Sequence, residues 1–151
     1  MQWILLVLVI SIVIGALRGG KLRNLTEIRV NAWWLLPIGF LLLAASSFVP
    51  DGYDDVAVGL VLASYAPLLL FVWLNRDLSG IWIAGLGILM NFSVILINGG
   101  MPVLEQAAVL AGETGELVLD AKHVLLTTET RLPFLADIIP LPGAVLSLGD
   151  V

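Results

Sequence analysis

The sequence predicts an all-α membrane protein, a polytopic bundle of four transmembrane helices followed by an outward-facing amphipathic or re-entrant segment. Two observations carry this prediction. Hydrophobic residues make up 60% of the chain and charged residues only 13%, with a mean hydropathy of +1.05, whereas about a quarter of the residues of a soluble domain are charged. The apolar residues also gather into four runs close to the length of about 20 residues that crosses a bilayer.

The four runs place a transmembrane region in residues 1–97. A single run of this kind is equally compatible with a buried helix or strand of a soluble protein, but four in series favour the membrane. None of them contains an ionised side chain, as the cost of a charge in hydrocarbon requires. A chain of this size also has too little interior to hide so much apolar surface from water. The predicted spans are residues 3–17, 32–49, 56–74 and 81–97.

Lysine and arginine predict the orientation of these spans, because short basic loops stay in the cytoplasm. The connectors 18–31 and 75–80 carry Arg18, Lys21, Arg23, Arg29 and Arg76. The loop 50–55 carries none of either residue, and the segment after the fourth span adds only Lys122 and Arg131. We therefore expect the connectors 18–31 and 75–80 in the cytoplasm, and the N-terminus and residues 98–142 outside.

The N-terminal run is predicted to be a retained span. No basic residue precedes it, and the residues that follow it do not form a small-residue cleavage site. The five tryptophans fall at predicted span ends, where amphipathic rings prefer the headgroup region.

The second region, residues 98–151, is more polar. A turn at Asn98-Gly99-Gly100 leads to Pro102, which suits the first position of a helix. The apolar stripe of that amphipathic helix comprises Val103, Leu104, Ala107, Ala108, Leu110 and Ala111. Gly112 is expected to end the helix, and the acidic residues 113–120 are expected to be exposed.

Residues 122–142 are too apolar for a simple loop and too interrupted by proline for a span. We expect a helix that ends before Pro133, followed by a re-entrant or interfacial stretch, which needs protein or water around its backbone. Gly143 to Val151 has the character of the start of a fifth span. In that position Asp150 would enter the hydrocarbon, where a carboxylate is a functional candidate by default.

The C-terminal third also carries a characteristic set of residues. Its members are Asn98-Gly99-Gly100-Met101-Pro102-Val103, Lys122-His123, Thr130, Leu132, Leu135, Asp137, Ile139, Pro140, Ser147, Gly149 and Asp150. This pattern resembles an uncharacterised family of small bacterial multispanning membrane proteins. The resemblance implies a bacterial membrane location and carries no activity. It also implies a chain that continues past the Gly-Asp pair through a last span, whereas this sequence ends at Val151.

Six ionisable residues form a candidate polar cluster in this largely apolar region: Lys122, His123, Glu129, Arg131, Asp137 and Asp150. Charges near membrane depth pair with one another or face water. In the functional interpretation they line an outward-facing cavity, such as a proton or ion path. In the structural interpretation, which the sequence favours, Lys122 and Arg131 pair with Glu129 and Asp137 to hold the segment over the bundle.

Other polar and small residues support narrower predictions. His123, the only histidine, has the chemistry of a haem or chlorin ligand, although a single interfacial imidazole needs no such role. Gly59 and Ala63 form a small-xxx-small pair suited to close helix contact, and Asn91 is expected to hydrogen-bond across helices.

The sequence indicates no catalytic or metal-binding motif and no particular cofactor. It has no cysteine, and its pI of about 4.5 argues against nucleic-acid binding. The expected surroundings are the lipid bilayer and membrane protein partners. The leading hypothesis is a non-enzymatic accessory or scaffold subunit of a larger bacterial membrane complex. A small ion- or proton-coupled transporter is the alternative, and a pigment- or haem-binding subunit is a third hypothesis.

Overall fold

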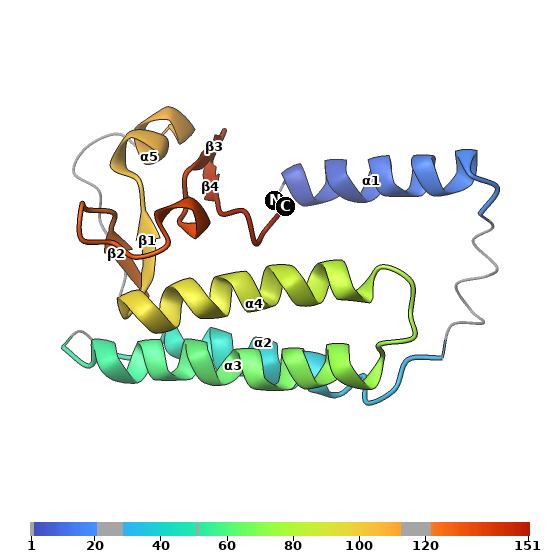
Figure 1. The fold of residues 1–151 in the computed structure, drawn as a ribbon, viewed down its shortest axis with the longest axis horizontal. Coiled ribbons are helices and arrows are strands. Elements are labelled where there is room, and N and C mark those ends of the chain that lie inside the picture. The colour runs from blue at the N-terminus through green and yellow to red at the C-terminus, as the bar shows by residue number, and fades with distance from the viewer. Residues whose placement is uncertain (1, 21–28, 51, 113–121) are drawn as a thin grey trace. The chain divides into compact units, whose positions relative to one another are not determined.

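The computed structural model describes residues 2–20, 29–50, 52–112 and 122–151, and it divides into two units, residues 1–30 and 31–151. Each unit is described by itself. The first contains one helix, α1 (Gln2–Leu17), which confirms a helix at the first predicted span (Figure 1). The predicted acidic stretch 113–120 and the basic residues Lys21 and Arg23 lie outside the described residues.

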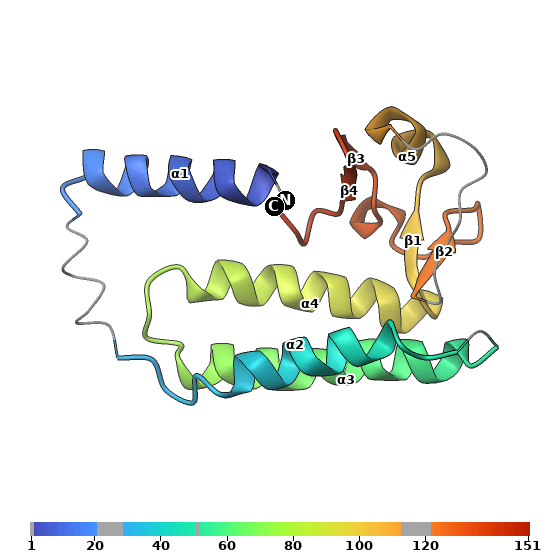
Figure 2. The same ribbon diagram turned by 180° about the vertical axis from the view of Figure 1, so that it is seen from behind.

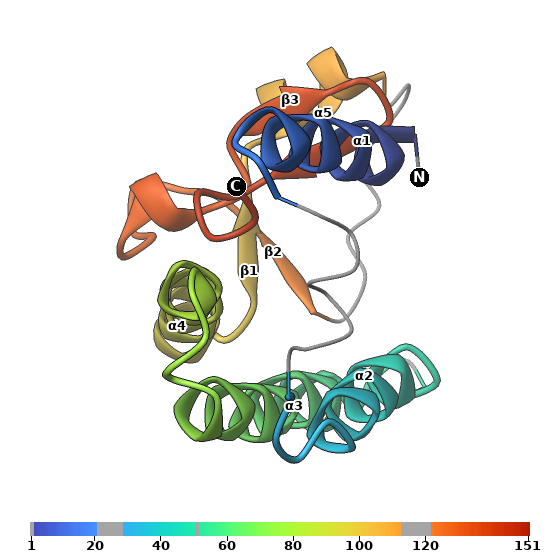
Figure 3. The same ribbon diagram turned by 90° about the vertical axis from the view of Figure 1, so that its right-hand side faces the viewer.

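Three helices run side by side in the second unit, with α3 between α2 and α4 (Figures 2 and 3). They are α2 (Leu35–Ser46), α3 (Asp54–Leu74) and α4 (Ile81–Asn98). Glycines let them approach closely. A Cβ on Gly39 of α2 would lie 3.1 Å from the Ser64 carbonyl oxygen of α3, and one on Gly85 of α4 would lie 2.7 Å from a methyl group of Val72.

Two of these helices, α3 and α4, are long and apolar enough to cross a membrane. Only 22% of the most apolar 18-residue stretch of α3 and 17% of that of α4 is buried within the structure, so most of their apolar surface faces outward. The second predicted span, residues 32–49, is wrong in length. The 12 residues of α2 reach about 18 Å at 1.5 Å per residue, short of the hydrocarbon thickness of about 30 Å.

A buried asparagine explains the late start of α2. Asn75, at the end of α3, is 3% exposed. Its side chain accepts a hydrogen bond from the Asn31 backbone N–H at 2.7 Å and donates one to the Asn31 carbonyl oxygen at 2.9 Å. These two bonds hold the chain in a turn before α2 begins.

The C-terminal region contains two small sheets, so the all-α prediction is wrong here and the chain is mostly helical. Strand β1 (Met101–Val103) pairs in parallel with β2 (His123–Leu125), and β3 (Ile139–Leu141) pairs antiparallel with β4 (Ala144–Leu146). The described residues of this region also form a short helix, α5 (Glu105–Ala111), and a 3-10 turn, η2 (Pro133–Leu135). Met101 and Leu135 pack with Val61, Val94 and Ile95 in one apolar core, which fixes the region against α3 and α4.

Two predicted helical elements are replaced by strands. Residues 123–125 do not form the expected helix before Pro133, because Lys122 and Leu126 bond to the backbone of β1 at Met101 and Val103. The expected fifth span is instead a hairpin. Proline at the second turn position and a positive φ at the third favour a tight turn, and Pro142 is followed by Gly143 at φ 80°.

The predicted amphipathic helix is present but shorter. Helix α5 begins at Glu105, because Pro102 lies in β1, where its carbonyl oxygen accepts a hydrogen bond from the Asp137 N–H at 2.8 Å. Gly112 ends the helix with a φ of 104°, as expected. Ala107, Ala108 and Ala111 are buried, as predicted for the apolar stripe, whereas Leu110 is 73% exposed. Val103 is buried as well, but in β1 and not in the helix.

Candidate functional site

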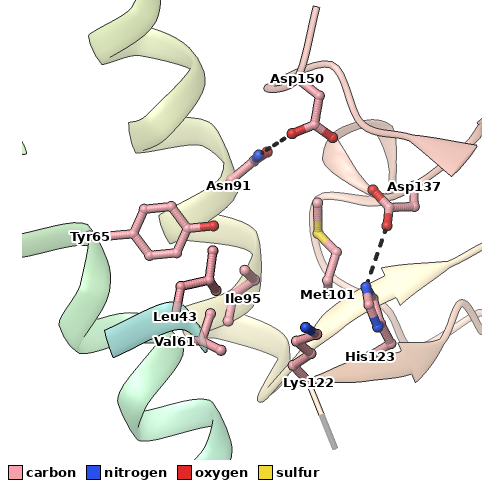
Figure 4. Close-up of a pocket in the computed structure, with 10 residues that line it drawn as sticks. All are labelled: Leu43, Val61, Tyr65, Asn91, Ile95, Met101, Lys122, His123, Asp137 and Asp150. Atoms are coloured by element: carbon pink, nitrogen blue, oxygen red, sulfur yellow. Dashed lines mark hydrogen bonds and ion pairs between the residues drawn. The ribbon is translucent and has the colours of Figure 1, made fainter. Parts of the chain in front are cut away.

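A pocket of about 230 Å³ lies where the C-terminal region packs on the three helices (Figure 4). Its apolar wall comes from the helices and β1 and comprises Leu43, Val61, Ile95 and Met101. Its polar wall comprises Tyr65, Asn91, Lys122, His123, Asp137 and Asp150. The fold thus places four of the six residues of the predicted polar cluster around one cavity.

Strand β1 positions both Asp137 and His123. On one side, Met101 pairs with His123 in the parallel sheet. On the other side, the Asp137 backbone forms a bridge with Val103, and its carbonyl oxygen accepts a hydrogen bond from the Leu104 N–H at 3.0 Å. The two side chains therefore meet beside the strand, with Asp137 Oδ2 4.0 Å from His123 Nε2, too far for a hydrogen bond.

Asp137 is the most unusual polar group of the pocket. It is 7% exposed, and its Oδ1 is buried without a hydrogen-bond partner among the described residues. Burial raises the pKa of the Asp137 carboxyl to about 7, and the negative charge of Asp150 contributes in the same direction. Loss of hydration disfavours the ionised form. Asp137 therefore exchanges its proton near neutral pH.

Asp150 belongs to a hydrogen-bonded turn that rests on α4. Its Oδ1 accepts from Asn91 Nδ2 at 2.8 Å, and its Oδ2 accepts from the Ser147 N–H at 2.9 Å. The Ser147 hydroxyl, fully buried, lies 2.8 Å from Asp150 Oδ2 and 2.9 Å from Asn91 Oδ1. With one proton it donates to one of these oxygens at a time.

Glycines make the contact between this turn and α4 possible. A Cβ on Gly87 would collide with the Gly149 carbonyl oxygen, and one on Gly149 would collide with the Asn91 side chain. Asp150 is thus held at the pocket by a turn, and its predicted place in a fifth span is wrong.

Other predicted residues lie away from the pocket. Glu129 and Arg131 are exposed in the loop after β2, where the Arg131 backbone N–H donates to Asn98 Oδ1 at 2.9 Å. The ion-pair partner that the structure gives Asp137 is His123. Gly59 and Ala63 are exposed on α3, and no atom of the described chain lies within 4 Å of a Cβ built on Gly59. Asn91 donates a hydrogen bond to Asp150 in the C-terminal turn, whereas the sequence predicted a hydrogen bond to another helix.

Sequence reasoning missed Tyr65 and Ser147. Tyr65 carried a usable signal, because a phenol inside an apolar helical run needs a partner for its hydroxyl group. The ring of Tyr65 also packs edge-on against Phe92, with the centroids 5.9 Å apart. Ser147 carried no such signal, since its role depends on how residues 144–150 fold back onto α4.

The pocket fits a small solute better than a large cofactor. Sites for drug-sized ligands occupy about 300–1,000 Å³, so a cavity of about 230 Å³ leaves too little room for a haem beside His123. Within the described ranges, no group of three or more histidine, aspartate or glutamate side chains is placed to hold a metal ion.

Comparison with known proteins gives two matches. A model of a family of unknown function, DUF5317, matches residues 27–151. An uncharacterized protein of Thermotoga maritima is 31% identical over 138 residues, which cover 87% of this chain and 74% of that protein. No solved structure matches.

Proposed function

The chain belongs to DUF5317, a family of unknown function, and from its pocket we propose that it is a small proton-coupled membrane transporter that binds a small polar or ionic solute. The observation that carries the proposal is the buried Asp137 carboxyl, which lines a pocket with Asp150, His123 and Lys122 and has one oxygen without a hydrogen-bond partner among the described residues. Ionisable groups whose pKa is strongly perturbed by burial and that line a cleft are candidates for functional sites.

The membrane placement that we propose follows the hydrophobic lengths and the charges. Helices α3 and α4 would cross the bacterial cytoplasmic membrane as a hairpin, with the loop that carries Arg76 in the cytoplasm. The pocket then opens on the outer side, because it lies toward the start of α3 and the end of α4. The basic residues 18–29 support the same orientation for the multi-pass chain.

The proposed cycle uses the two protonation states of Asp137. Near neutral pH the carboxyl is poised between the neutral and the ionised form. A cationic solute favours the ionised form, and an empty pocket favours the neutral form. Binding and release of the solute are thereby linked to release and uptake of a proton, which is the requirement for exchange transport.

The test is proton movement in proteoliposomes. The purified full-length protein is reconstituted with a pH-sensitive dye inside, and sodium, potassium, small amines and amino acids are added in turn outside. We expect at least one of them to move protons faster than in protein-free liposomes, and Asp137→Asn to remove that difference. The control is Glu129→Gln, an exposed carboxyl outside the pocket, which should behave as the unmodified protein. Proton movement that Asp137→Asn leaves intact would contradict the proposal.

A second candidate, an accessory subunit of a membrane complex, is favoured by a separate observation. An apolar groove of about 490 Å³ lies between α3 and α4, lined by Leu69, Val72, Trp73, Trp82, Gly85, Leu86 and Leu89. The groove offers a surface for another transmembrane helix. Purification in mild detergent should then co-isolate a partner protein in fixed proportion. Recovery as a single species that transports a solute would contradict this candidate.

A further inference from the structure

We propose that the pocket holds the protonated amino group of a small, partly apolar solute, with the ammonium at the carboxyl groups of Asp137 and Asp150 and the hydrocarbon on the apolar wall. This inference deepens the proposed function, since it assumes that the pocket is a solute site, and it names the class of solute.

One side-chain oxygen of Asp137 has no hydrogen-bond donor among the described residues. This oxygen, Oδ1, is buried, and no N–H or O–H of the described residues reaches it. A buried acceptor without a partner is costly, and the cost persists unless a donor enters. Protonation of the carboxyl removes its charge but supplies no partner within this pocket. A ligand N–H group would satisfy this deficit after a turn of the Asp137 side chain toward the pocket that it lines, because Oδ1 itself is almost fully covered.

Several ionisable groups surround that oxygen. The ionisable groups that face Asp137 are His123 and Lys122 from β2 and its start, Tyr65 from α3, and Asp150 from the C-terminal turn (Figure 4). The Asp150 carboxylate accepts hydrogen bonds from neutral groups, namely the Asn91 amide and the Ser147 N–H and hydroxyl. Each carboxylate oxygen accepts more than one hydrogen bond. A cation near Asp137 and Asp150 would thus find acceptors with remaining capacity.

Anions and divalent metal ions fit this pocket less well than an ammonium group does. Lys122 would attract an anion, but the Asp150 carboxylate would repel it, and an anion would leave Asp137 Oδ1 without a donor. A metal ion would need more oxygen or nitrogen ligands than this wall supplies, since six or more are usual for calcium and magnesium. Within the described ranges, no group of three acidic or histidine side chains is placed for one. An ammonium group needs only hydrogen-bond acceptors, which the wall provides.

The rest of the pocket wall is apolar. Leu43, Val61, Ile95 and Met101 line the cavity with hydrocarbon. A volume of about 230 Å³ equals roughly eight water molecules at about 30 Å³ each. An amine with a short branched chain matches both the size and the division of the pocket into a polar and an apolar side. Each methylene group that leaves water adds to the affinity.

Ammonium binding at this site depends on pH. Ammonium binding requires the ionised Asp137 carboxylate, whose pKa in the empty pocket is about 7. Affinity should therefore rise with pH up to about 7 and then level off, until the amine itself loses its proton near pH 10. Between pH 5.5 and pH 8 the affinity should increase on the order of tenfold to thirtyfold. Below pH 7 each binding event should release a proton.

Calorimetry on the full-length protein in detergent micelles tests this inference. The probe is isopentylamine, and its matched control is isovalerate, which has the same branched hydrocarbon and a carboxylate in place of the ammonium. We expect isopentylamine to bind at pH 8, more weakly at pH 5.5, and isovalerate not to bind. Leucine carries both groups, so its affinity relative to isopentylamine distinguishes an amino acid site from a simple amine site.

Variants locate the site. Asp137→Asn and Asp150→Asn should each weaken binding of isopentylamine or leucine by at least tenfold, while Glu129→Gln should leave it unchanged. The proton released on binding is measured on the unmodified protein, so this readout does not depend on a variant that folds. Three results would each overturn the inference. The first is that isovalerate binds as tightly as isopentylamine, the second is that neither isopentylamine nor leucine binds, and the third is that Asp137→Asn binds isopentylamine as tightly as the unmodified protein does. If isopentylamine binds but no solute is transported, the proposed transporter is wrong and the ammonium site stands. If sodium or potassium is transported but no amine binds, the ammonium site is wrong and the proposed transporter stands.

Discussion

Replacing Asp137 with asparagine should stabilise the protein at neutral pH, although it removes a buried polar contact. The pKa of the Asp137 carboxyl is about 7 in the folded protein against 3.8 for an unperturbed aspartate. An acid whose pKa is raised by folding holds its proton more tightly when folded. Its ionisation therefore destabilises the fold progressively as pH rises from about 4 to about 7, and the full penalty remains at higher pH.

The size of this effect follows from the shift. About three pKa units at 1.36 kcal/mol each give about 4 kcal/mol, and imperfect accommodation of the amide reduces the gain to roughly 2–4 kcal/mol. For a chain of this length that corresponds to an increase in Tm of roughly 4–16 °C. The gain should be present at pH 8 and should largely vanish at pH 4, where the native carboxyl is also neutral.

Tryptophan fluorescence during thermal unfolding in detergent measures this effect, since the chain contains five tryptophans. Other titrating groups affect both proteins, so the quantity compared is the difference in Tm between Asp137→Asn and the unmodified protein at the two pH values, at one scan rate. Glu129→Gln, which removes an exposed carboxyl, should show no such difference. An equal loss of Tm at pH 4 and pH 8 would contradict this prediction, because it would mean that folding does not raise the pKa of the Asp137 carboxyl.

Three further predictions concern the packing that builds the pocket. Gly39→Val should destabilise the fold by about 1–3 kcal/mol, because the new side chain meets Leu68 and the Ser64 carbonyl oxygen. Gly59→Val, with open space around it, should have little effect in the purified monomer, and an equal loss of Tm in both variants would contradict the assigned helix packing. Ser147→Ala should cost about 1–3 kcal/mol, because Asn91 Oδ1 and the Gly149 N–H lose their buried partner, and an unchanged Tm would contradict the docked turn. Gly143→Val should cost about 1–2 kcal/mol, because a β-branched residue is strained at a φ of 80°, and unaltered amide exchange in β3 and β4 would contradict the hairpin.

The long helices were predictable from the sequence, and the sheets were not. Helices α1, α3 and α4 follow from uninterrupted apolar runs, which leave the backbone few alternatives. Strands of three residues are too short to show a period. The parallel pairing of Met101 with His123 also joins residues 22 positions apart, and nothing local specifies such a partner. The prolines in residues 122–142 correctly exclude a span there, and Pro142-Gly143 is a turn signal that points to the observed hairpin.

The candidate site was partly predictable for a similar reason. Ionisable residues are rare in this chain, so those in its apolar C-terminal third stood out, and Lys122, His123, Asp137 and Asp150 do line one pocket. Glu129 and Arg131 were included only because they are near in sequence, and they lie in an exposed loop. The contact between Gly87 and Gly149, which brings Asp150 to α4, joins two glycines that have no individual signature.

The state of the Asp137 carboxyl is the point on which the site, its pH dependence and the proposed exchange all rest. Infrared spectroscopy of the purified protein measures it directly, as the band of a protonated carboxylic acid that is absent from Asp137→Asn. We expect this band to disappear with a midpoint near pH 7, and we expect isopentylamine to lower that midpoint. A carboxyl that is already ionised at pH 5, or one whose midpoint the amine does not move, would contradict these expectations.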